Sequence, residues 1–334
     1  MTSCRRWVGV VGWVLLCGLG SADGGGARPP ELFTLRGMCD ASAVVDAGRS
    51  RILVANDEDN ILRLYAVPGN GAPEQSFALD KLLRVDPEEP EADLEGAAAL
   101  GDRVFWVTSH GRSVKGKNRP SRRRFFAVRV GWKEDVCEVM SEGRPYLRLL
   151  DDLLADARLA PFGLAAASRK APKEAGALNI EALAARDDSS LWIGFRNPIP
   201  GGRALVIPLL NPVGLTIGER ARFGDPLLLD LGGLGFRDLA AWNAGWLIVA
   251  GPYAGGGPFA FFRWDGAGAS PAPIALPVPR GFAPEAAVVR PVPEGDELLL
   301  LSDDGSRSTG GVRCKDLEDP RQRAFRLLRL PWPP

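Results

Sequence analysis

Short apolar segments separated by turn residues run along most of the chain, and five pairs of them share one pattern. Each pair begins with an acidic residue followed by small or apolar residues, and a strongly apolar segment follows after a turn. The acidic residues are Asp40, Glu95, Glu181, Asp238 and Glu285. The strongly apolar segments are residues 51–55, 104–108, 191–195, 246–250 and 297–301. Turn residues between the two members predict a β-hairpin in each case.

The spacing of this repeat predicts a β-propeller. Successive acidic residues are 55, 86, 57 and 47 residues apart, and a period near 50 is typical of four-stranded propeller blades. A further apolar segment follows each pair and predicts a third strand. These segments are residues 62–65, 124–129, 204–207, 259–263 and 324–330. We therefore predict an all-β protein with five blades.

The interval of 86 residues is too long for one blade. Within it, Leu147, Leu150, Leu153 and Leu154 recur at helical spacing, which favours a short helical insertion near residues 145–160. A degenerate sixth blade is the alternative interpretation of the same interval.

The N-terminal residues have the features of a secretory signal. Arg5 and Arg6 precede an apolar stretch that is too short to favour a membrane span, and small residues follow it. We interpret residues 1–22 as a signal peptide, 23–33 as a flexible linker and 34–334 as a single propeller domain. The protein is then expected to be exported to the periplasm or the extracellular space. The bulky Leu16 argues against lipid anchoring through Cys17.

The charge balance, the apolar runs and the cysteines limit the expected binding partners, membrane spans and disulfides. Lys and Arg together number 41, as do Asp and Glu, so the overall charge gives no support for nucleic-acid binding. A second long apolar run is missing from the sequence, so we expect no membrane span, and we expect a monomer. Of the five cysteines, Cys39, Cys137 and Cys314 would remain after removal of the signal peptide, and they permit at most one disulfide among them. Their spacing does not select the pair.

The expected topology gathers the acidic residues of the repeat. Because sequential strands of a blade are antiparallel, the starts of the first strands and the ends of the second strands lie at the same end of each sheet. The five acids should therefore form a ring around the axis. Like charges held close together raise one another's pKa or attract a cation, and carboxylates are hard ligands that suit Ca²⁺.

We expect a central Ca²⁺ held chiefly by Glu95 and Glu181. Asp40, Asp238 and Glu285 would complete or orient its shell. The alternative is structural: the acids would only bind first-strand amides or pair with neighbouring Arg residues.

A basic loop adds candidate ligand-binding residues. Residues 112–124 form the densest charged run of the chain and follow the second strand of the second pair, so this loop should begin beside the expected cation. Arg112, Lys115 and Lys117 would bind a small anionic molecule there. His110, the single histidine, would be available for proton transfer. The alternatives are a solvated loop and a histidine that only holds a turn.

Several familiar kinds of site are excluded by the sequence. A single histidine rules out multi-histidine zinc sites. A phosphate-binding loop, a dinucleotide fingerprint, a nucleophile elbow and a C-x-x-C motif are all missing from the sequence.

The same residues carry a resemblance to a known family. Five segments resemble motifs of the bacterial family catalogued as domain of unknown function 3616. They are residues 36–43, 54–60, 93–96, 109–112 and 179–183. That resemblance runs from about Arg36 to the C-terminus and implies a propeller-like fold without an established activity. A looser similarity reaches propeller phytases, their esterase-like relatives and calcium-activated nucleotidases, which would make Asp93, Glu95 and Glu181 metal-facing. The extended acidic motifs of the phytases are missing from this sequence, which argues against a multi-calcium phosphatase site.

Together these observations predict an exported propeller with an axial Ca²⁺ site that binds, or also hydrolyses, an anionic phosphoester. The alternative is a non-catalytic propeller that binds a ligand or a protein and whose acidic residues are structural. The sequence leaves open whether the protein is an enzyme.

Overall fold

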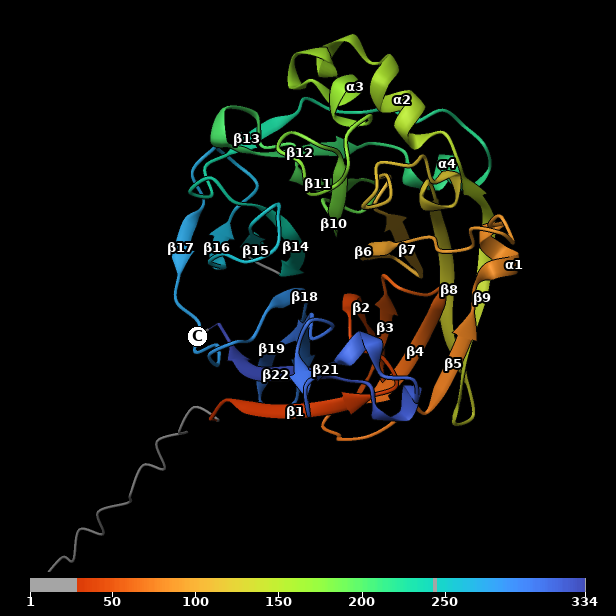
Figure 1. The fold of residues 1–334 in the computed structure, drawn as a ribbon, viewed down its shortest axis with the longest axis vertical. Helices are drawn as coiled ribbons and strands as arrows, with labels where there is room; N and C mark the ends of the chain where they lie inside the picture. The colour runs from red at the N-terminus through yellow and green to blue at the C-terminus, as the bar shows by residue number, and fades with distance from the viewer. Residues whose placement is uncertain (1–28, 243–244, 334) are drawn as a thin grey trace, which may run out of the picture.

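Five four-stranded antiparallel sheets stand around a common axis in the computed structural model, which describes residues 29–242 and 245–333 (Figure 1). The first blade contains β2 (Ala41–Gly48), β3 (Arg51–Asn56), β4 (Ile61–Ala66) and β5 (Gln75–Ala78). The second contains β6 (Leu94–Leu100), β7 (Arg103–Thr108), β8 (Phe125–Lys133) and β9 (Val136–Tyr146). The third contains β10 (Asn179–Ala185), β11 (Leu191–Asn197), β12 (Ala204–Leu209) and β13 (Leu227–Leu229).

The fourth and fifth blades complete the ring. The fourth contains β14 (Gly235–Trp242), β15 (Gly245–Gly251), β16 (Ala260–Trp264) and β17 (Ala272–Ile274). The fifth contains β18 (Pro284–Val292), β19 (Gly295–Ser302), β22 (Ala324–Trp332) and, as its outermost strand, β1 (Glu31–Arg36). A small hairpin of β20 (Ser308–Thr309) and β21 (Val312–Arg313) precedes β22. The predictions of an all-β propeller, of five blades and of the five third strands are therefore confirmed.

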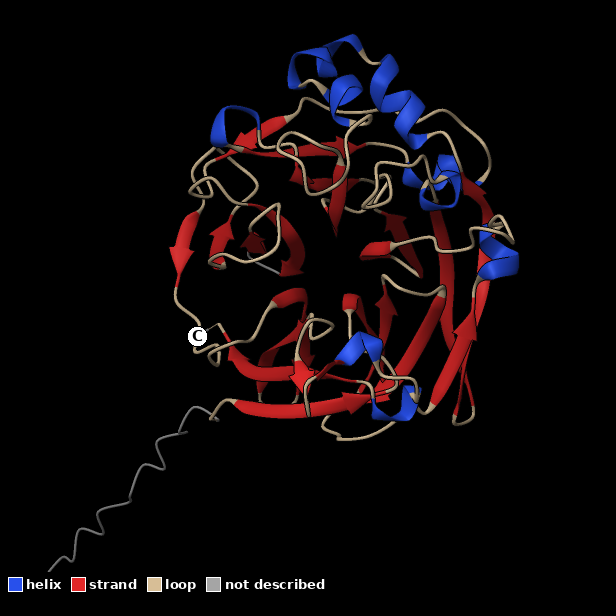
Figure 2. Ribbon diagram, in the orientation of Figure 1, coloured by secondary structure: helices blue, strands red, loops and turns tan. Residues whose placement is uncertain are grey.

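The α-helices are short and lie on the outside of the ring (Figure 2). The α-helices are α1 (Asp80–Leu83), α2 (Leu149–Ala155), α3 (Leu164–Ala167) and α4 (Pro212–Thr216). The 3-10 helices are η1 (Pro120–Arg122), η2 (Ala157–Phe162), η3 (Pro200–Gly202), η4 (Cys314–Asp316) and η5 (Pro320–Gln322). The long second interval of the repeat contains α2, η2 and α3, so the helical insertion is present and the sixth blade is not.

Apolar side chains fill the spaces between neighbouring blades. The five buried clusters each join two adjacent sheets, and the first strands contact one another in a closed circuit, β2, β6, β10, β14, β18 and back to β2. The insertion adds Leu150, Leu153 and Leu164 to the cluster between the second and third blades. Small residues are needed where the inner strands meet: a Cβ on Gly96 would lie 3.0 Å from the Leu183 amide nitrogen.

The N-terminal strand closes the ring. Strand β1 pairs antiparallel with β22, with Glu31 opposite Arg329 and Arg36 opposite Ala324. Residues 31–33, which we expected in the linker, are therefore part of the fifth sheet. Because the last blade is built from both ends of the chain, the fold cannot be completed until the C-terminal strands are in place.

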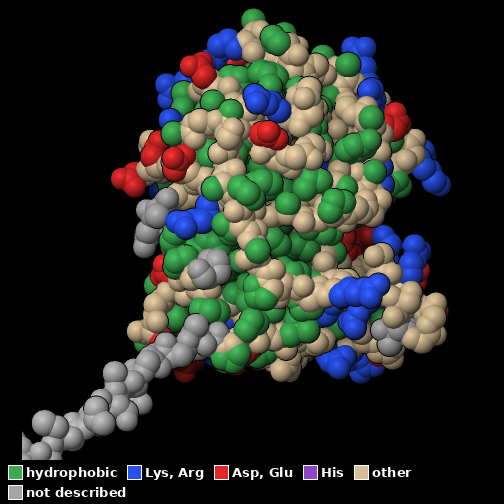
Figure 3. Space-filling view, turned by 90° about the vertical axis from the view of Figure 1, so that its left-hand side faces the viewer, with side chains coloured by type: hydrophobic (Ala, Val, Ile, Leu, Met, Phe, Trp, Pro, Cys, Tyr) green, Lys and Arg blue, Asp and Glu red, His purple; other side chains and the backbone are tan. Residues whose placement is uncertain are grey.

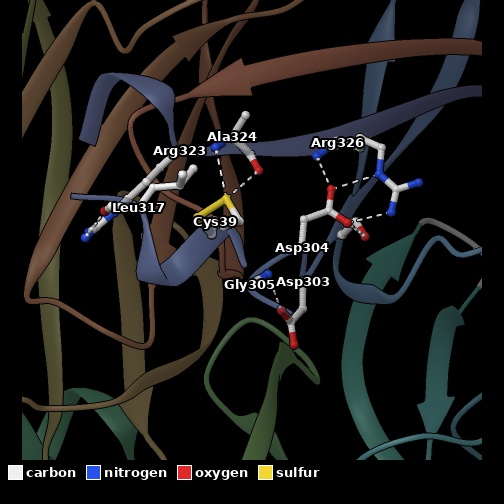
Figure 4. Close-up of a disulfide and its surroundings, with 10 residues drawn as sticks. Cys39, Asp303, Asp304, Gly305, Leu317, Arg323, Ala324 and Arg326 are labelled. Atoms are coloured by element: carbon white, nitrogen blue, oxygen red, sulfur yellow. Dashed lines mark hydrogen bonds and ion pairs between the residues drawn. A yellow bond between two sulfur atoms is a disulfide. The ribbon is translucent and has the colours of Figure 1, made fainter. Parts of the chain in front are cut away.

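A disulfide between Cys39 and Cys314 reinforces this closure. Figure 4 shows its surroundings, where Asp304 turns toward Arg326 and Asp303 points away from it. The Arg326 Nε donates to Asp304 Oδ2 over 2.8 Å. Cys137, the third cysteine of the described residues, is buried and forms no disulfide among them. The sequence did not select which two cysteines pair. The structure pairs Cys39 with Cys314, which joins the first blade to the last.

The expected signal peptide and the Cys17 site lie outside the described residues. Within the described ranges, every helix is too short or too polar to cross a bilayer.

Candidate functional site

A β-bulge recurs at the same place in every first strand. In each blade, the pairing between the first and second strands skips one residue near the start of the first strand. The skipped residues are Ser42, Glu95, Glu181, Arg237 and Glu285. A bulge redirects the side chain of the extra residue. Because the five blades surround one axis, these residues occupy equivalent positions around it, and we call them the axial ring.

Three glutamates of the axial ring meet. The carboxylates of Glu95, Glu181 and Glu285 each offer an oxygen within 4.8 Å of the other two. Their exposed fractions are 7%, 1% and 7%. The predicted convergence of acidic residues from separate blades is thus present for these three.

Arg237 lies among these carboxylates and balances part of their charge. Its Nη1 is 3.2 Å from Glu181 Oε2, and its Nη2 donates to Glu285 Oε2. Glu181 is further held by Arg196, whose Nη1 donates to Oε1 over 2.6 Å, and by the Asn179 amide at 2.7 Å. The ring therefore combines three acids with one of its own cations.

Glu95 differs from the other two glutamates. Within residues 29–242 and 245–333, no hydrogen bond or ion pair reaches its carboxylate. Burial, together with the charges of Glu181 and Asp93, raises the pKa of Glu95 well above its ordinary value. Burial also raises the pKa of Glu285 to about 8, although Arg237 opposes this shift. At neutral pH the site consequently needs a proton or a further cation.

Asp238 does not join the axial ring, although we expected it there. It is the residue after the bulge, and its two carboxylate oxygens accept hydrogen bonds from the backbone amides of Leu239 and Ala287, each at 2.7 Å. Burial raises the pKa of Asp238 to about 7, while the two amide bonds lower it. Since Ala287 belongs to β18, Asp238 ties the fourth blade to the fifth.

Asp40 also lies outside the axial ring. It comes two residues before the bulge at Ser42 and forms a bridge with Asp303. Its carboxylate belongs to a separate group with Asp57 and Glu58, whose oxygens lie within 4.8 Å of one another. We call Asp40, Asp57 and Glu58 the seam cluster, because it stands where the first and last blades meet.

The basic loop lies at the end of the second blade that carries Glu95. Most of its cationic groups bind carboxylates or carbonyl oxygens of the protein. Arg122 Nη1 is 2.9 Å from Asp93 Oδ2. Arg112 donates to the carbonyl oxygens of Ser168 and Gly116 at 2.9 and 3.0 Å. Lys115 and Lys117 are exposed. Of the three expected anion-binding residues, the two lysines are therefore the ones with open side chains.

His110 is buried, with an exposed fraction of 2%. Its Nδ1 pairs with the Thr108 carbonyl oxygen at 2.8 Å, while its Nε2 is buried without a hydrogen-bond partner among the described residues. Burial lowers the pKa of His110 to about 4, and the charges of Arg123 and Arg124 act in the same direction. The imidazole is therefore neutral at pH 7, as a proton acceptor must be.

Hollows in the surface also lie outside the axial ring. One, of about 820 Å³, is lined by the hairpins that join first and second strands, including Asp187, Asp296 and Trp246. Another, of about 430 Å³, lies between the fourth and fifth blades and is lined by apolar residues such as Phe261, Ile274 and Phe282. Figure 3, which views this side of the molecule, shows hydrophobic side chains gathered across its middle.

Comparison with protein families now places the chain. The model of a family described as "Protein of unknown function (DUF3616)" matches residues 40–127 and 133–284. The chain belongs to this family. The matched residues include four of the five positions of the axial ring, all but Glu285, and they contain the whole basic loop. The predicted family resemblance is thereby confirmed. None of the curated proteins matches the chain.

The fold of this DUF3616 protein is shared by a solved structure of low sequence identity. The Malassezia sympodialis allergen Mala s 1 is 10% identical, with a TM-score of 0.52 over 91% of this chain and 96% of the other. The Myxococcus xanthus glutaminyl cyclase is also 10% identical, with a TM-score of 0.44 over 90% and 95% of the two chains. At this identity the likeness concerns the fold alone.

Sequence reasoning missed Arg237 and Ser42 as members of the axial ring because it searched for an acid in every copy. A positional signal was present: a small or polar residue stands two places before the bulge in all five blades. These residues are Asp40, Asp93, Asn179, Gly235 and Ala283. Alignment on this position would have placed Ser42 beside Glu95 and Arg237 beside Glu285.

Proposed function

We propose that the protein is a propeller whose axial ring binds a hard divalent cation of the Ca²⁺ kind through Glu95, Glu181 and Glu285. The observation that carries the proposal is the meeting of three buried carboxylates from three blades, one of which, Glu95, has no donor within the described residues. A buried carboxylate without a partner is costly. A bound cation removes that cost.

The oxygen positions suit such an ion. Ligands of Ca²⁺ lie about 2.3–2.6 Å from the ion, so two of them on one ion are separated by up to about 5 Å. The three glutamate oxygens fall within 4.8 Å of one another. Ca²⁺ takes about six to eight oxygens. Two further buried oxygens, Ser42 Oγ and Asn179 Oδ1, have no hydrogen-bond partner in the described part of the chain and belong to the same end of the inner strands.

The charges leave room for a cation despite Arg237. The Arg237 guanidinium forms ion pairs with Glu181 and Glu285 but not with Glu95. Arg196 pairs with Glu181 as well, so two arginines face three glutamates and the negative charge of Glu95 is not balanced. We infer that the ion lies nearest Glu95 and that Arg237 weakens its binding through like-charge repulsion.

Calorimetric titration tests this function. Protein treated with a chelator is titrated with CaCl₂, in parallel with Glu95→Gln and with the matched control Glu138→Gln, whose side chain is exposed on the outer strand β9. We expect heat of binding in the wild type and the control, and loss of at least tenfold in affinity in Glu95→Gln. Equal affinity in all three proteins would remove the axial site.

A phosphoester is the ligand class that we propose for the bound ion. A divalent cation polarises and neutralises phosphoryl oxygens, and the exposed Lys115 and Lys117 lie on the loop that Arg122 anchors to Asp93 at the same end. The neutral His110 would accept a proton in hydrolysis. Phosphate release from a panel of phosphoesters, compared between wild type and Glu95→Gln with added Ca²⁺, separates hydrolysis from binding. No release from any member of the panel would leave a binding propeller.

The alternative function is a non-catalytic scaffold with structural acids. Two observations favour it: Asp238 binds two backbone amides, and Arg237 joins two of the three ring glutamates. On this account the axial ring holds the blades together without an ion. Removal of Ca²⁺ would then leave the unfolding midpoint unchanged, whereas a ligand of the native state raises it.

We infer that the protein works outside the cytoplasm. The disulfide between Cys39 and Cys314 supports this, because such bonds persist in oxidising compartments and are rare in the cytosol. Fractionation of the producing cells tests it, and protein found only in the cytosolic fraction would contradict it.

A further inference from the structure

We propose a second cation site, in the seam cluster, where the carboxylates of Asp40, Asp57 and Glu58 take a hard divalent cation such as Ca²⁺. The site stands on its own residues, none of which belongs to the axial ring. It goes beyond the proposed function because its three carboxylates are different from those of the axial ring.

The seam cluster gathers its ligands from two parts of the first blade. Asp40 lies immediately before β2, and Asp57 with Glu58 lies in the turn between β3 and β4. Their carboxylate oxygens come within 4.8 Å of one another. The bridge between Asp40 and Asp303 brings in a residue of the last blade. Three carboxylates at this spacing match the oxygen ligands that Ca²⁺ prefers.

Two carboxylates of the cluster lack the partners that buried acids normally have. Asp40 is 7% exposed, and within the described residues no amide, hydroxyl or cationic group donates a hydrogen bond to it. Its hydrogen-bond partner is instead the carboxyl group of Asp303, another acid. Asp57 Oδ1 is buried and has no hydrogen-bond partner in the described part of the chain. Buried polar atoms are nearly always satisfied, so these oxygens point to a missing ligand.

The local cation does not balance the cluster. Lys315 Nζ is 3.2 Å from Glu58 Oε1 and is the one ammonium that reaches the cluster within the described ranges. Three carboxylates therefore face one ammonium, and a divalent cation would offset the remaining negative charge.

The backbone around Asp40 is shaped closely to its carboxylate. A Cβ on Gly305 would lie 1.6 Å from Asp40 Oδ1, so a larger residue here would displace the Asp40 carboxylate. The Lys315 amide donates to the Gly305 carbonyl oxygen over 3.2 Å, and the Asp304 amide donates to the Cys39 carbonyl oxygen over 3.0 Å. The disulfide thus holds the loop of the last blade against Asp40. A cation here would bridge the same seam that the disulfide closes.

Equilibrium dialysis with radioactive Ca²⁺ tests the proposal by counting bound ions per chain. The proteins compared are the wild type, Asp57→Asn, Glu95→Gln and the control Glu138→Gln. We expect two ions in the wild type and the control, and one ion in each of the other two variants. Glu58→Gln, whose side chain is exposed, serves as a second seam variant if Asp57→Asn does not fold as judged by circular dichroism.

The outcomes separate this site from the axial one. One ion in the wild type and in Asp57→Asn, with none in Glu95→Gln, would overturn the seam site and leave the axial site standing. One ion in the wild type and in Glu95→Gln, with none in Asp57→Asn, would support the seam site and overturn the axial one. No ion in the wild type would overturn both.

Discussion

The Arg237 guanidinium lies 3.2 Å from Glu181 Oε2, so a cation supplied by the fourth blade stands against an acid supplied by the third. Arg237 is 5% exposed, and it also contacts Glu285 of the fifth blade. One side chain therefore links three blades at the axis. This position makes it both a stabilising group and a competitor for any cation that the ring binds.

Replacement of Arg237 should separate these two roles. In Arg237→Gln, the carboxylates of Glu181 and Glu285 lose a buried partner, so the free energy of unfolding without Ca²⁺ should fall by about 3–5 kcal/mol. Affinity for Ca²⁺ should rise, because the competing charge is gone. Urea unfolding with and without Ca²⁺ measures both effects. An unchanged affinity would show that Arg237 does not face the ion.

Glu95 and Asp238 should respond in opposite ways. Glu95→Gln removes a buried carboxylate without a donor, so the cation-free protein should gain about 1 kcal/mol in stability while it loses Ca²⁺ binding. Asp238→Asn places an amide group against a backbone N–H and should cost about 1–3 kcal/mol without changing Ca²⁺ affinity. Urea unfolding and calorimetric titration of both variants check this contrast. Equal behaviour of the two would contradict the separate roles given to them.

His110 should make stability depend on pH. Its pKa is lowered to about 4 in the folded chain, against about 6.5 in the unfolded chain. The unfolded state therefore gains a proton first as the pH falls. The stability due to neutral His110 is complete above about pH 6.5 and is lost as the pH falls toward 4, by roughly 3 kcal/mol.

The variant His110→Asn isolates this effect. Asparagine tolerates the positive φ of 56° at this position, and its amide can donate to the Thr108 carbonyl oxygen as Nδ1 does. The difference in unfolding free energy between wild type and variant should be constant above pH 6.5 and should shrink below it. A difference that stays constant down to pH 4 would contradict the assignment.

Reduction of the disulfide should loosen the closure between the first and last blades. The bond joins residues 275 positions apart, and removal of such a link typically costs about 2–4 kcal/mol. Unfolding in urea with and without a reductant measures the loss. Cys137→Ala should keep the full sensitivity to reductant, because Cys137 is not part of the bond. A wild type insensitive to reductant would show that the bond is not formed in solution.

Much of the fold was accessible from the sequence because the repeat was regular. The five third strands and the helical insertion fall where the apolar pattern predicted them. The closing strand β1 was missed, since residues 31–36 pair with β22 at the opposite end of the chain and no local pattern reports such a partner. The disulfide was left open for the same reason: three cysteines allow several pairs, and only the fold selects one.

The site was predicted less completely, and the β-bulges explain why. A search for acids picked Asp40 and Asp238, which lie two residues before and one residue after the skipped position in their strands. For Asp238, the shift of one residue along the strand turns the side chain to a different face. The sequence alone does not mark the bulge, so a serine and an arginine in equivalent positions went unrecognised. That Arg237 stands among the ring glutamates could be recognised only once the pairing register of the strands was known.

The axial site is tested most directly by thermal unfolding in EDTA and then in excess Ca²⁺, performed on Asp57→Asn and on the double variant Asp57→Asn/Glu95→Gln. The seam cluster is disabled in both proteins, so any rise in the midpoint reports the axial ring alone. We predict that Ca²⁺ raises the midpoint of Asp57→Asn by several degrees and leaves that of the double variant unchanged. An equal rise in both proteins, or no rise in either, would contradict an ion held by Glu95, Glu181 and Glu285.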